Sequence, residues 1–247
     1  MLKPLPRIRE EEWMDRPDLD DRLHRDALLG LARLNRISAV AGPLYRRIRR
    51  LARQTAGDLN SITTSPDRPL RVLDVASGGG DVPIDWLKRA AQDQFNLEIT
   101  TLDISPLALE VQRERAHRAG VHLQPRQADL LCDELPSGFD VVTNSLFLHH
   151  LDPPQVTKAI DKMQSCGRHV LICDLVRSRL NLASVWIASR LLTRSPVVHT
   201  DATISVRAGW TRAEMAGMIR TATGRDVVVK HLHPARLVAC WSTESQS

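Results

Sequence analysis

The sequence predicts an α/β fold: a doubly wound, mostly parallel, seven-stranded sheet preceded by a helical extension. First, a short apolar segment, residues 70–75, is followed by three glycines and a helical pattern, which is typical of open parallel sheets. Second, further short apolar segments alternate with helical ones. Third, two strand-like segments, 227–232 and 236–241, follow the last helix and predict an antiparallel hairpin.

The first part of the 247-residue chain predicts helices, so we divide it into an extension, 1–65, and a sheet domain, 66–247. Apolar residues recur at helical spacing after Asp20, which is placed to cap that helix. Gly42 and Pro43 predict a break before the next helix. The Ser-, Thr-, Asp- and Pro-rich residues 57–69 predict a linker.

The second helix, 44–53, concentrates arginines around one apolar stripe in a chain of net charge +5. A solvated helix packed on the core is the favoured interpretation, because charge runs are usually that. The alternatives are peripheral contact with an anionic membrane surface and an entrance for an acidic substrate. Aromatic residues do not interleave these arginines, so we expect no nucleic-acid binding.

The four cysteines are scattered without metal-ligand spacing, so we expect buried thiols in a reducing compartment and no metal site. No apolar run reaches the ~18 residues that a membrane span needs. The N-terminal residues do not resemble a signal peptide. These observations predict a cytoplasmic protein.

The glycine loop follows Asp74 in the pattern acid-x-small-x-Gly-x-Gly, formed by Asp74, Ala76, Gly78 and Gly80. A dinucleotide fingerprint fits poorly, because counting from Gly78 places Pro83 where glycine or alanine is needed. A carboxylate near the loop would repel a pyrophosphate but suits a positively charged ligand. S-adenosylmethionine carries a sulfonium and an ammonium group and no phosphate.

At these residues the sequence resembles motif I of the class I S-adenosylmethionine-dependent methyltransferases, with alanine at position 76 where the family usually has glycine. We expect this change to shift the loop slightly. The resemblance implies a Rossmann-like methyltransferase fold, a small-molecule acceptor, S-adenosylmethionine as cofactor and S-adenosylhomocysteine (SAH) as product. It is specific over about residues 70–175.

A second acid, Asp103, ends the predicted strand 97–102, and Ser105 with Pro106 begins the next helix. The family places its ribose-binding acid here, so Asp103 is expected to accept both ribose hydroxyls. By resemblance, Asp129 accepts from the adenine amino group and Leu130 donates its backbone N–H. The full set of expected cofactor contacts is Asp74, Ala76, Ser77, Gly78, Gly80, Asp103, Ile104, Asp129, Leu130, Asn144 and Ser145.

Two residues are the catalytic candidates. His149 falls between the predicted strand 139–144 and a helix capped by Asp152, whose positive end should keep the imidazole neutral, as a general base requires. In some small-molecule O-methyltransferases of this class, a histidine after strand four and an aspartate after strand five act together. His149 and Asp174 match those positions. The alternative is that His149 only lines the cofactor's methionine end or is a polar residue at a helix start.

A helical lid is predicted over about 177–208, with an apolar helix at 182–192 and then a loop through His199 and Asp201. Those two residues are weaker candidates for acceptor contact. The predicted function is methyl transfer to a small-molecule acceptor, at a hydroxyl oxygen. Alternatives are C-methylation of a quinone or polyketide, cofactor binding without catalysis and, with least support, a nicotinamide-dependent oxidoreductase. The acceptor and the oligomeric state stay open.

Overall fold

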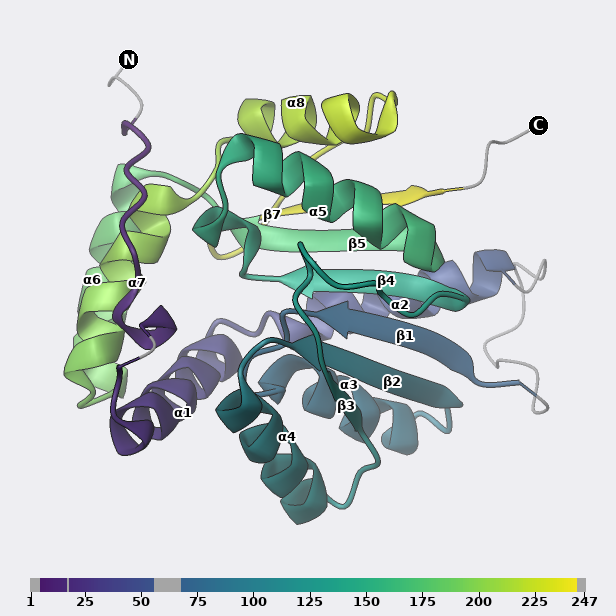
Figure 1. Cartoon of the computed structure of the whole chain (residues 1–247), viewed down its shortest axis with the longest axis horizontal. Helices are drawn as coiled ribbons and strands as arrows, with labels where there is room; N and C mark the ends of the chain where they lie inside the picture. The colour runs from purple at the N-terminus through teal and green to yellow at the C-terminus, as the bar shows by residue number, and fades with distance from the viewer. Residues whose placement is uncertain (1–4, 17, 56–67, 244–247) are drawn as a thin grey trace.

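A computed structural model describes residues 5–16, 18–55 and 68–243 of the chain. The described residues form one seven-stranded sheet with helices on both faces (Figure 1). Most of the predicted linker, 57–69, lies outside the described residues, as do the first four residues and the predicted domain boundary near residue 65.

The strand order is β3-β2-β1-β4-β5-β7-β6, and β7 runs antiparallel to β5 and β6. The strands are β1 (Leu70–Val75), β2 (Leu97–Asp103), β3 (Gln124–Gln127), β4 (Phe139–Ser145), β5 (Gly167–Leu175), β6 (Lys230–Leu232) and β7 (Arg236–Ser242). The order reverses between β1 and β4, which is where open α/β sheets bind their ligands. The predicted doubly wound sheet with a final hairpin is confirmed, although β6 is shorter than expected.

The helices are η1 (Trp13–Asp15), α1 (Asp21–Ile37), α2 (Ala41–Thr55), α3 (Asp81–Gln92), α4 (Pro106–Ala119), η2 (Leu148–His150), α5 (Pro153–Cys166), α6 (Arg179–Leu192), α7 (Pro196–Ala208) and α8 (Arg212–Thr223). Alternate side chains of β1 enter two cores. Leu73 packs with Ile160 of α5 on one face, and Val72 packs with Ile48 of α2 and Trp86 of α3 on the other. Fully burying each such side chain stabilises the fold by ~1.5–3 kcal/mol.

Two predicted helix boundaries are wrong. Gly42 and Pro43 lie inside the first turn of α2, because a missing N–H costs no hydrogen bond there. The predicted loop after residue 192 is largely α7, which Ser195 caps and Pro196 begins. One thiol also departs from expectation, because Cys132 is exposed on a turn.

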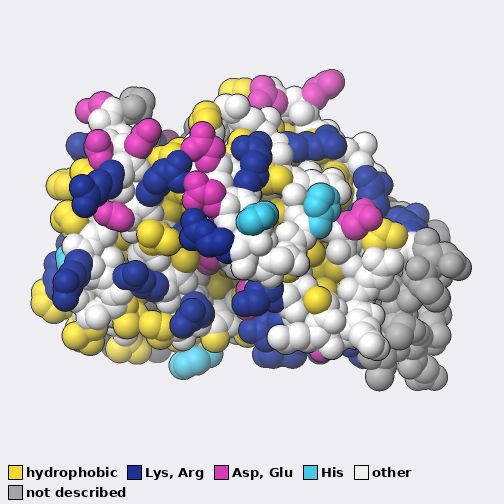
Figure 2. Space-filling model, turned by 90° about the horizontal axis from the view of Figure 1, so that it is seen from below, with side chains coloured by type: hydrophobic (Ala, Val, Ile, Leu, Met, Phe, Trp, Pro, Cys, Tyr) yellow, Lys and Arg dark blue, Asp and Glu magenta, His cyan; other side chains and the backbone are white. Residues whose placement is uncertain are grey.

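The basic helix α2 buries its apolar stripe, Leu44, Ile48 and Leu51, against the core, as predicted. Arg49 pairs with Asp93 at 2.6 Å. Positive side chains are dispersed over the face seen in Figure 2, with acidic ones between them and hydrophobic ones gathered near its lower left edge. Membrane contact through α2 stays a prediction. None of the helices in the described part of the chain has the length and apolar character that crossing a bilayer requires.

The N-terminal segment, residues 5–16, runs alongside α7 at one edge of the molecule (Figure 1). The guanidinium of Arg7 donates to the carbonyl oxygens of Ala208 (2.8 Å) and Leu151 (2.8 Å) and stacks 3.7 Å from the centroid of the Trp210 ring. The carboxylate of Asp201 in α7 accepts from the backbone N–H groups of residues 13 and 14. These contacts fix the segment, below called the N-terminal strap, over one end of the sheet.

Candidate active site

A cavity of about 1560 Å³ opens at the carboxyl ends of the parallel strands. The turn after β1, the tip of β2, η2, the N-terminal strap and helices α1 and α6 line it. A pocket for one drug-sized ligand has ~300–1,000 Å³, so this cavity has room for a nucleoside and a second small molecule.

The turn after β1 uses three residues with positive φ: Ala76 (52°), Gly78 (51°) and Gly80 (70°). Glycine adopts positive φ at little cost, whereas a Cβ atom makes this conformation strained for alanine. The predicted change at Ala76 is therefore seen as an alanine backbone in the left-handed region. The Ser77 hydroxyl donates to the Asp74 carbonyl oxygen at 2.6 Å and fixes the turn. A Cβ atom added at Gly78 would meet no described atom within 4 Å, so the space beside it is open to a ligand.

Asp103 lies directly beside the glycine turn, as the sequence predicts. Its Oδ2 accepts from the Gly78 N–H at 2.7 Å, and its Oδ1 accepts from the Ser105 N–H at 3.0 Å. Burial raises the pKa of Asp103, while these two backbone donors oppose the rise. Each carboxylate oxygen has a second lone pair, which can accept a ribose hydroxyl from the cavity side.

Asp74, Gly80 and Asn144 differ from the other expected cofactor contacts, because they do not line the cavity. Asp74 is buried between β1 and β4, where its Oδ1 accepts from the Thr143 hydroxyl at 2.6 Å. Burial raises its pKa to about 7. The Asn144 amide donates to the Val75 carbonyl oxygen at 2.9 Å. Asp74 and Asn144 therefore lie behind the turn rather than in front of it.

The remaining expected contacts, Ala76, Ser77, Gly78, Ile104, Asp129, Leu130 and Ser145, line the cavity together with Asp103. The Asp129 Oδ1 accepts from the backbone N–H groups of Leu131 at 2.7 Å and of Cys132 at 3.3 Å. Ile104 has 63% of its surface exposed, so an apolar face is available next to Asp103.

His149 and Asp174 are brought together, as expected from their positions after β4 and in β5. Asp174 Oδ1 lies 2.6 Å from His149 Nδ1, and Oδ2 accepts from the His149 backbone N–H at 2.9 Å. A carboxylate only accepts hydrogen bonds, so Nδ1 carries a hydrogen and Nε2 faces away from Asp174. Nε2 lies instead 3.7 Å from Oε1 of Glu12, and the His149 side chain lines the cavity.

The expectation that the helix N-terminus keeps His149 neutral is wrong. Burial opposes the charged imidazolium, but the carboxylates of Asp174 and Glu12 outweigh burial and raise the pKa of His149 to about 10. Two carboxylates, at 2.6 Å and 3.7 Å from the ring nitrogens, act more strongly than the partial charge of a helix end. With Glu12 in place, the two carboxylates therefore favour the protonated form of His149.

Three residues of this site were not predicted: Glu12, Asp15 and, as a partner of them, His150. Glu12 is only 4% exposed, and its pKa is lowered because the nearby histidines outweigh its burial. Asp15 Oδ2 lies 2.9 Å from His150 Nδ1. Glu12 follows two exposed glutamates in the sequence, and no local pattern sets it apart.

His199 and Asp201 do not line the cavity. The His199 Nε2 lies 2.9 Å from the Thr193 carbonyl oxygen, and Asp201 binds the strap. These two residues support the walls of the site, in contrast to the acceptor contact considered for them.

Comparison with known proteins adds to this geometry. Residues 72–170 match a family model described as a methyltransferase domain. A ubiquinone biosynthesis O-methyltransferase of Pseudomonas fluorescens is 32% identical over 111 residues, which cover 44% of this chain and 45% of that protein. The chain thus aligns with about half the length of the curated relatives it matches.

Two solved structures have a similar fold. An O-methyltransferase family 2 protein of Planctomyces limnophilus, in complex with apigenin, gives a TM-score of 0.61 at 20% identity, over 92% of this chain and 63% of that one. A magnesium protoporphyrin IX methyltransferase of Synechocystis, with bound SAH, gives 0.51 at 12% identity, over 93% of this chain and 90% of that one. The matched segment, residues 72–170, therefore belongs to the class I S-adenosylmethionine-dependent methyltransferases, as its glycine turn and two acids indicated.

Proposed function

We propose that this chain is an S-adenosylmethionine-dependent methyltransferase that transfers a methyl group to a hydroxyl oxygen of a small aromatic acceptor. One observation carries the proposal: the imidazole of His149, held by Asp174, lines the same cavity as the glycine turn and Asp103. A cofactor beside the turn and an acceptor beside His149 would share that cavity. The curated relatives, which are O-methyltransferases, support the choice of oxygen.

The residues present fit a cationic nucleoside. Burial raises the pKa values of three carboxyl groups around the glycine turn, those of Asp74, Asp81 and Asp103. Each of these groups would ionise more readily beside a positive ligand, so together they favour a sulfonium or ammonium group over a phosphate. The SAH-bound relative of similar fold agrees with this choice.

In this proposal, Asp103 holds the ribose hydroxyls, Asp129 and Leu130 bind the adenine edge, and Ile104 covers the adenine face. Ala76, Ser77, Gly78 and Ser145 border the path toward the methionine end, while Asp74, Gly80 and Asn144 shape the turn from behind. Residues 66–247 are the cofactor-binding domain, with α6 and α7 as its lid over 177–208 and residues 1–65 as the helical extension.

The cofactor supplies an activated methyl group on a sulfonium, an excellent leaving group. The chain's main task is then to hold the acceptor oxygen in line with the S–CH₃ bond, and such positioning contributes up to ~7–11 kcal/mol. A phenolic acceptor has a pKa near ~10, so proton removal during attack contributes a further ~10²–10⁴-fold. His149 Nε2 takes this proton, and Asp174 keeps the ring oriented.

Glu12 occupies the place where the acceptor hydroxyl would approach Nε2, 3.7 Å from that atom. For proton transfer, the hydroxyl must take the place of the Glu12 carboxylate. Removal of one of the two carboxylates beside the ring also removes part of the interaction that raises the pKa of His149. Binding of the acceptor therefore brings its hydroxyl to His149 Nε2 and also lowers the pKa of His149, so that the imidazole can accept the proton.

A cofactor-binding protein without catalysis is the second candidate, because Glu12 blocks Nε2 in this structure. The test begins with calorimetric titration of the full chain with SAH, for which we expect binding. Tritiated-methyl transfer from S-adenosylmethionine is then measured with 3,4-dihydroxybenzoate, apigenin and a small-molecule cell extract as acceptors. If the calorimetric titration shows SAH binding but none of these acceptors gains the tritiated methyl group, the non-catalytic candidate is selected.

The catalytic role of His149 is tested with His149→Ala, and with His117→Ala as a control at an exposed histidine of α4. We expect turnover to fall by ~10²–10⁴-fold in His149→Ala while SAH affinity stays within about threefold. His117→Ala should behave as the unaltered chain. A near-normal rate in His149→Ala would remove the base assignment and leave the cofactor site intact.

A further inference from the structure

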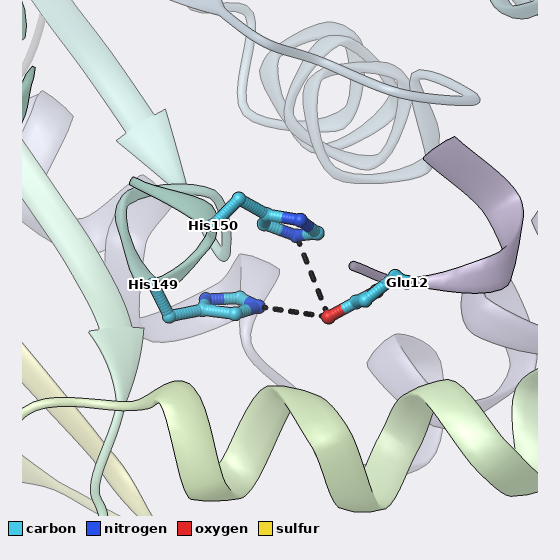
Figure 3. A group of neighbouring side chains, drawn as sticks. All are labelled: Glu12, His149 and His150. Carbon is cyan, nitrogen blue, oxygen red and sulfur yellow. Dashed lines mark ion pairs between the residues drawn. The ribbon is translucent and has the colours of Figure 1, made fainter. Parts of the chain in front are cut away.

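Three potential metal ligands converge at the acceptor end of the cavity (Figure 3). Oε1 of Glu12 lies 3.7 Å from Nε2 of His149 and 3.7 Å from Nε2 of His150. The three ligand atoms all lie within 4.8 Å of one another. The two rings stand side by side with centroids 4.4 Å apart, so both Nε2 atoms face the same carboxylate.

Each histidine is held by a second carboxylate on its other nitrogen. Nδ1 of His149 lies 2.6 Å from Asp174, and Nδ1 of His150 lies 2.9 Å from Asp15. Carboxylates only accept hydrogen bonds, so both Nδ1 atoms carry hydrogens. Metal-binding histidines are typically held in this way, with a carboxylate on the nitrogen that does not touch the metal.

The charges of the cluster also favour a cation. Three carboxylates, those of Glu12, Asp15 and Asp174, surround two imidazoles. Glu12 and Asp174 are buried, and their ion-pair partners among the described residues are histidines. Buried carboxylates are stable when they are paired or bind a metal, and a divalent ion would balance this set better than a single proton.

We propose that Glu12, His149 and His150 bind a divalent transition-metal ion of the zinc type through Oε1 and the two Nε2 atoms. Bonds of ~2.0–2.2 Å in a tetrahedral site place ligand atoms ~3.4 Å apart, so the observed 3.7 Å separations close by a few tenths of an ångström. All three residues line the cavity, so the remaining coordination position faces the cavity and takes water or an oxygen of a small molecule.

This site goes beyond the proposed function. A metal ion at Nε2 of His149 uses the lone pair that would accept the acceptor's proton, so the metal-bound and base-competent states exclude each other. The site also departs from the expectation that the chain holds no metal. That expectation rested on the spacing of the cysteines, whereas these ligands come from positions 12, 149 and 150.

The test uses the full chain, stripped with chelator and saturated with SAH, so that cofactor binding is verified separately. Zn²⁺ is titrated by calorimetry, and the bound metal is counted by mass spectrometry. We expect one ion per chain, with at least tenfold weaker binding in His150→Gln and in Glu12→Gln. Asp15→Asn should weaken binding by ~10–100-fold, because it frees the His150 ring.

His117→Gln, at an exposed histidine of α4, is the matched control and should bind Zn²⁺ as the unaltered chain does. Circular dichroism and SAH titration verify that each variant folds. X-ray absorption spectroscopy of Zn²⁺ bound to the unaltered chain gives a test that does not depend on variants. We expect its spectrum to show two imidazole nitrogen ligands and oxygen ligands. Any of three results would overturn the proposal. These are Zn²⁺ binding that persists in the Glu12→Gln, His150→Gln double variant, a sulfur ligand in the X-ray absorption spectrum, and no uptake of Zn²⁺ by the SAH-bound chain.

Discussion

The glycine turn and the histidine cluster line the same cavity but are assembled from very different separations along the chain. The turn joins Gly78 to Asp103 across 25 positions; Gly78 follows β1, and Asp103 ends the neighbouring parallel strand β2. The cluster joins Glu12 to His149 and Asp174, which lie on the strap, on η2 and in β5. The first is therefore fixed by the sheet, whereas the second also depends on docking of the strap.

The two regions also differ in the interactions that hold them. Backbone N–H groups fix Asp103, and these donors belong to the glycine turn after β1 and to the N-cap of α4. Beside one backbone hydrogen bond, from Ile8 to Arg207, side chains fix the strap. Arg7 reaches backbone carbonyls near η2 and α7, and Asp201 accepts from the strap's own N–H groups. The cofactor side should therefore tolerate loss of the strap, while the acceptor side should not.

The largest expected effect is on turnover, from Asp174→Asn. An asparagine can present its amide N–H to His149 Nδ1, which would leave the ring with the wrong nitrogen protonated. We expect tritiated-methyl transfer to the acceptor identified as above to fall by ~10²–10⁴-fold, with SAH affinity unchanged. Asp161→Asn, at an exposed carboxylate of α5, is the control. An equal loss of SAH affinity would show that the two ends of the cavity are not separable.

The next effect is on cofactor affinity, from Asp103→Asn. The amide oxygen can still accept from Gly78, but the charge-assisted bonds to the ribose are lost. Hydrogen bonds to charged groups contribute ~1.5–3 kcal/mol, so the Kd for SAH should rise roughly 10–100-fold by calorimetry. The same titration of Asp161→Asn should give the original Kd. A change below threefold would argue that Asp103 serves the turn alone.

This contrast explains what the sequence could predict. The turn was predictable because Asp74, Gly78 and Asp103 lie at or just after the carboxyl ends of strands whose apolar pattern is local, and parallel strands bring these ends together. His149 and Asp174 were predictable through family resemblance, since His149 follows β4 and Asp174 lies at the carboxyl end of β5. Glu12 was not, because its neighbours are glutamates that stay exposed. Its burial depends on α7, a helix that the sequence pattern did not indicate.

A third effect is on the strap, from Asp201→Ala. Two partly buried N–H groups, those of Trp13 and Met14, lose their acceptor, at a cost of about 2 kcal/mol. For a chain of this size the Tm should fall by roughly 4–8 °C. Hydrogen exchange of residues 5–16 should rise, while SAH affinity stays the same. Thr200→Ala, on the same helix, is the control, and unchanged exchange in Asp201→Ala would contradict anchoring of the strap by this carboxylate.

The smallest expected effect is a pH dependence on the cofactor side. Burial raises the pKa of Asp74 to about 7, against ~3.9 in an unfolded chain. The folded state therefore binds this proton more tightly, so the stability contribution of Asp74 falls as pH rises from ~4 to ~7. S-adenosylmethionine carries a sulfonium cation and prefers the carboxylate, so its affinity should change in the opposite direction, rising by about tenfold between pH 6 and 8, which corresponds to ~1.4 kcal/mol.

Asp74→Asn distinguishes this carboxylate from the other acids of the cavity. The asparagine keeps an oxygen for the Thr143 hydroxyl but does not titrate, so S-adenosylmethionine affinity should lose its rise with pH. Asp161→Asn should keep the original slope. Because Asp74 lies behind the turn, a slope that survives in Asp74→Asn would assign the titration to Asp81 or Asp103, which line the cavity directly, and would place the charge recognition in front of the turn rather than behind it.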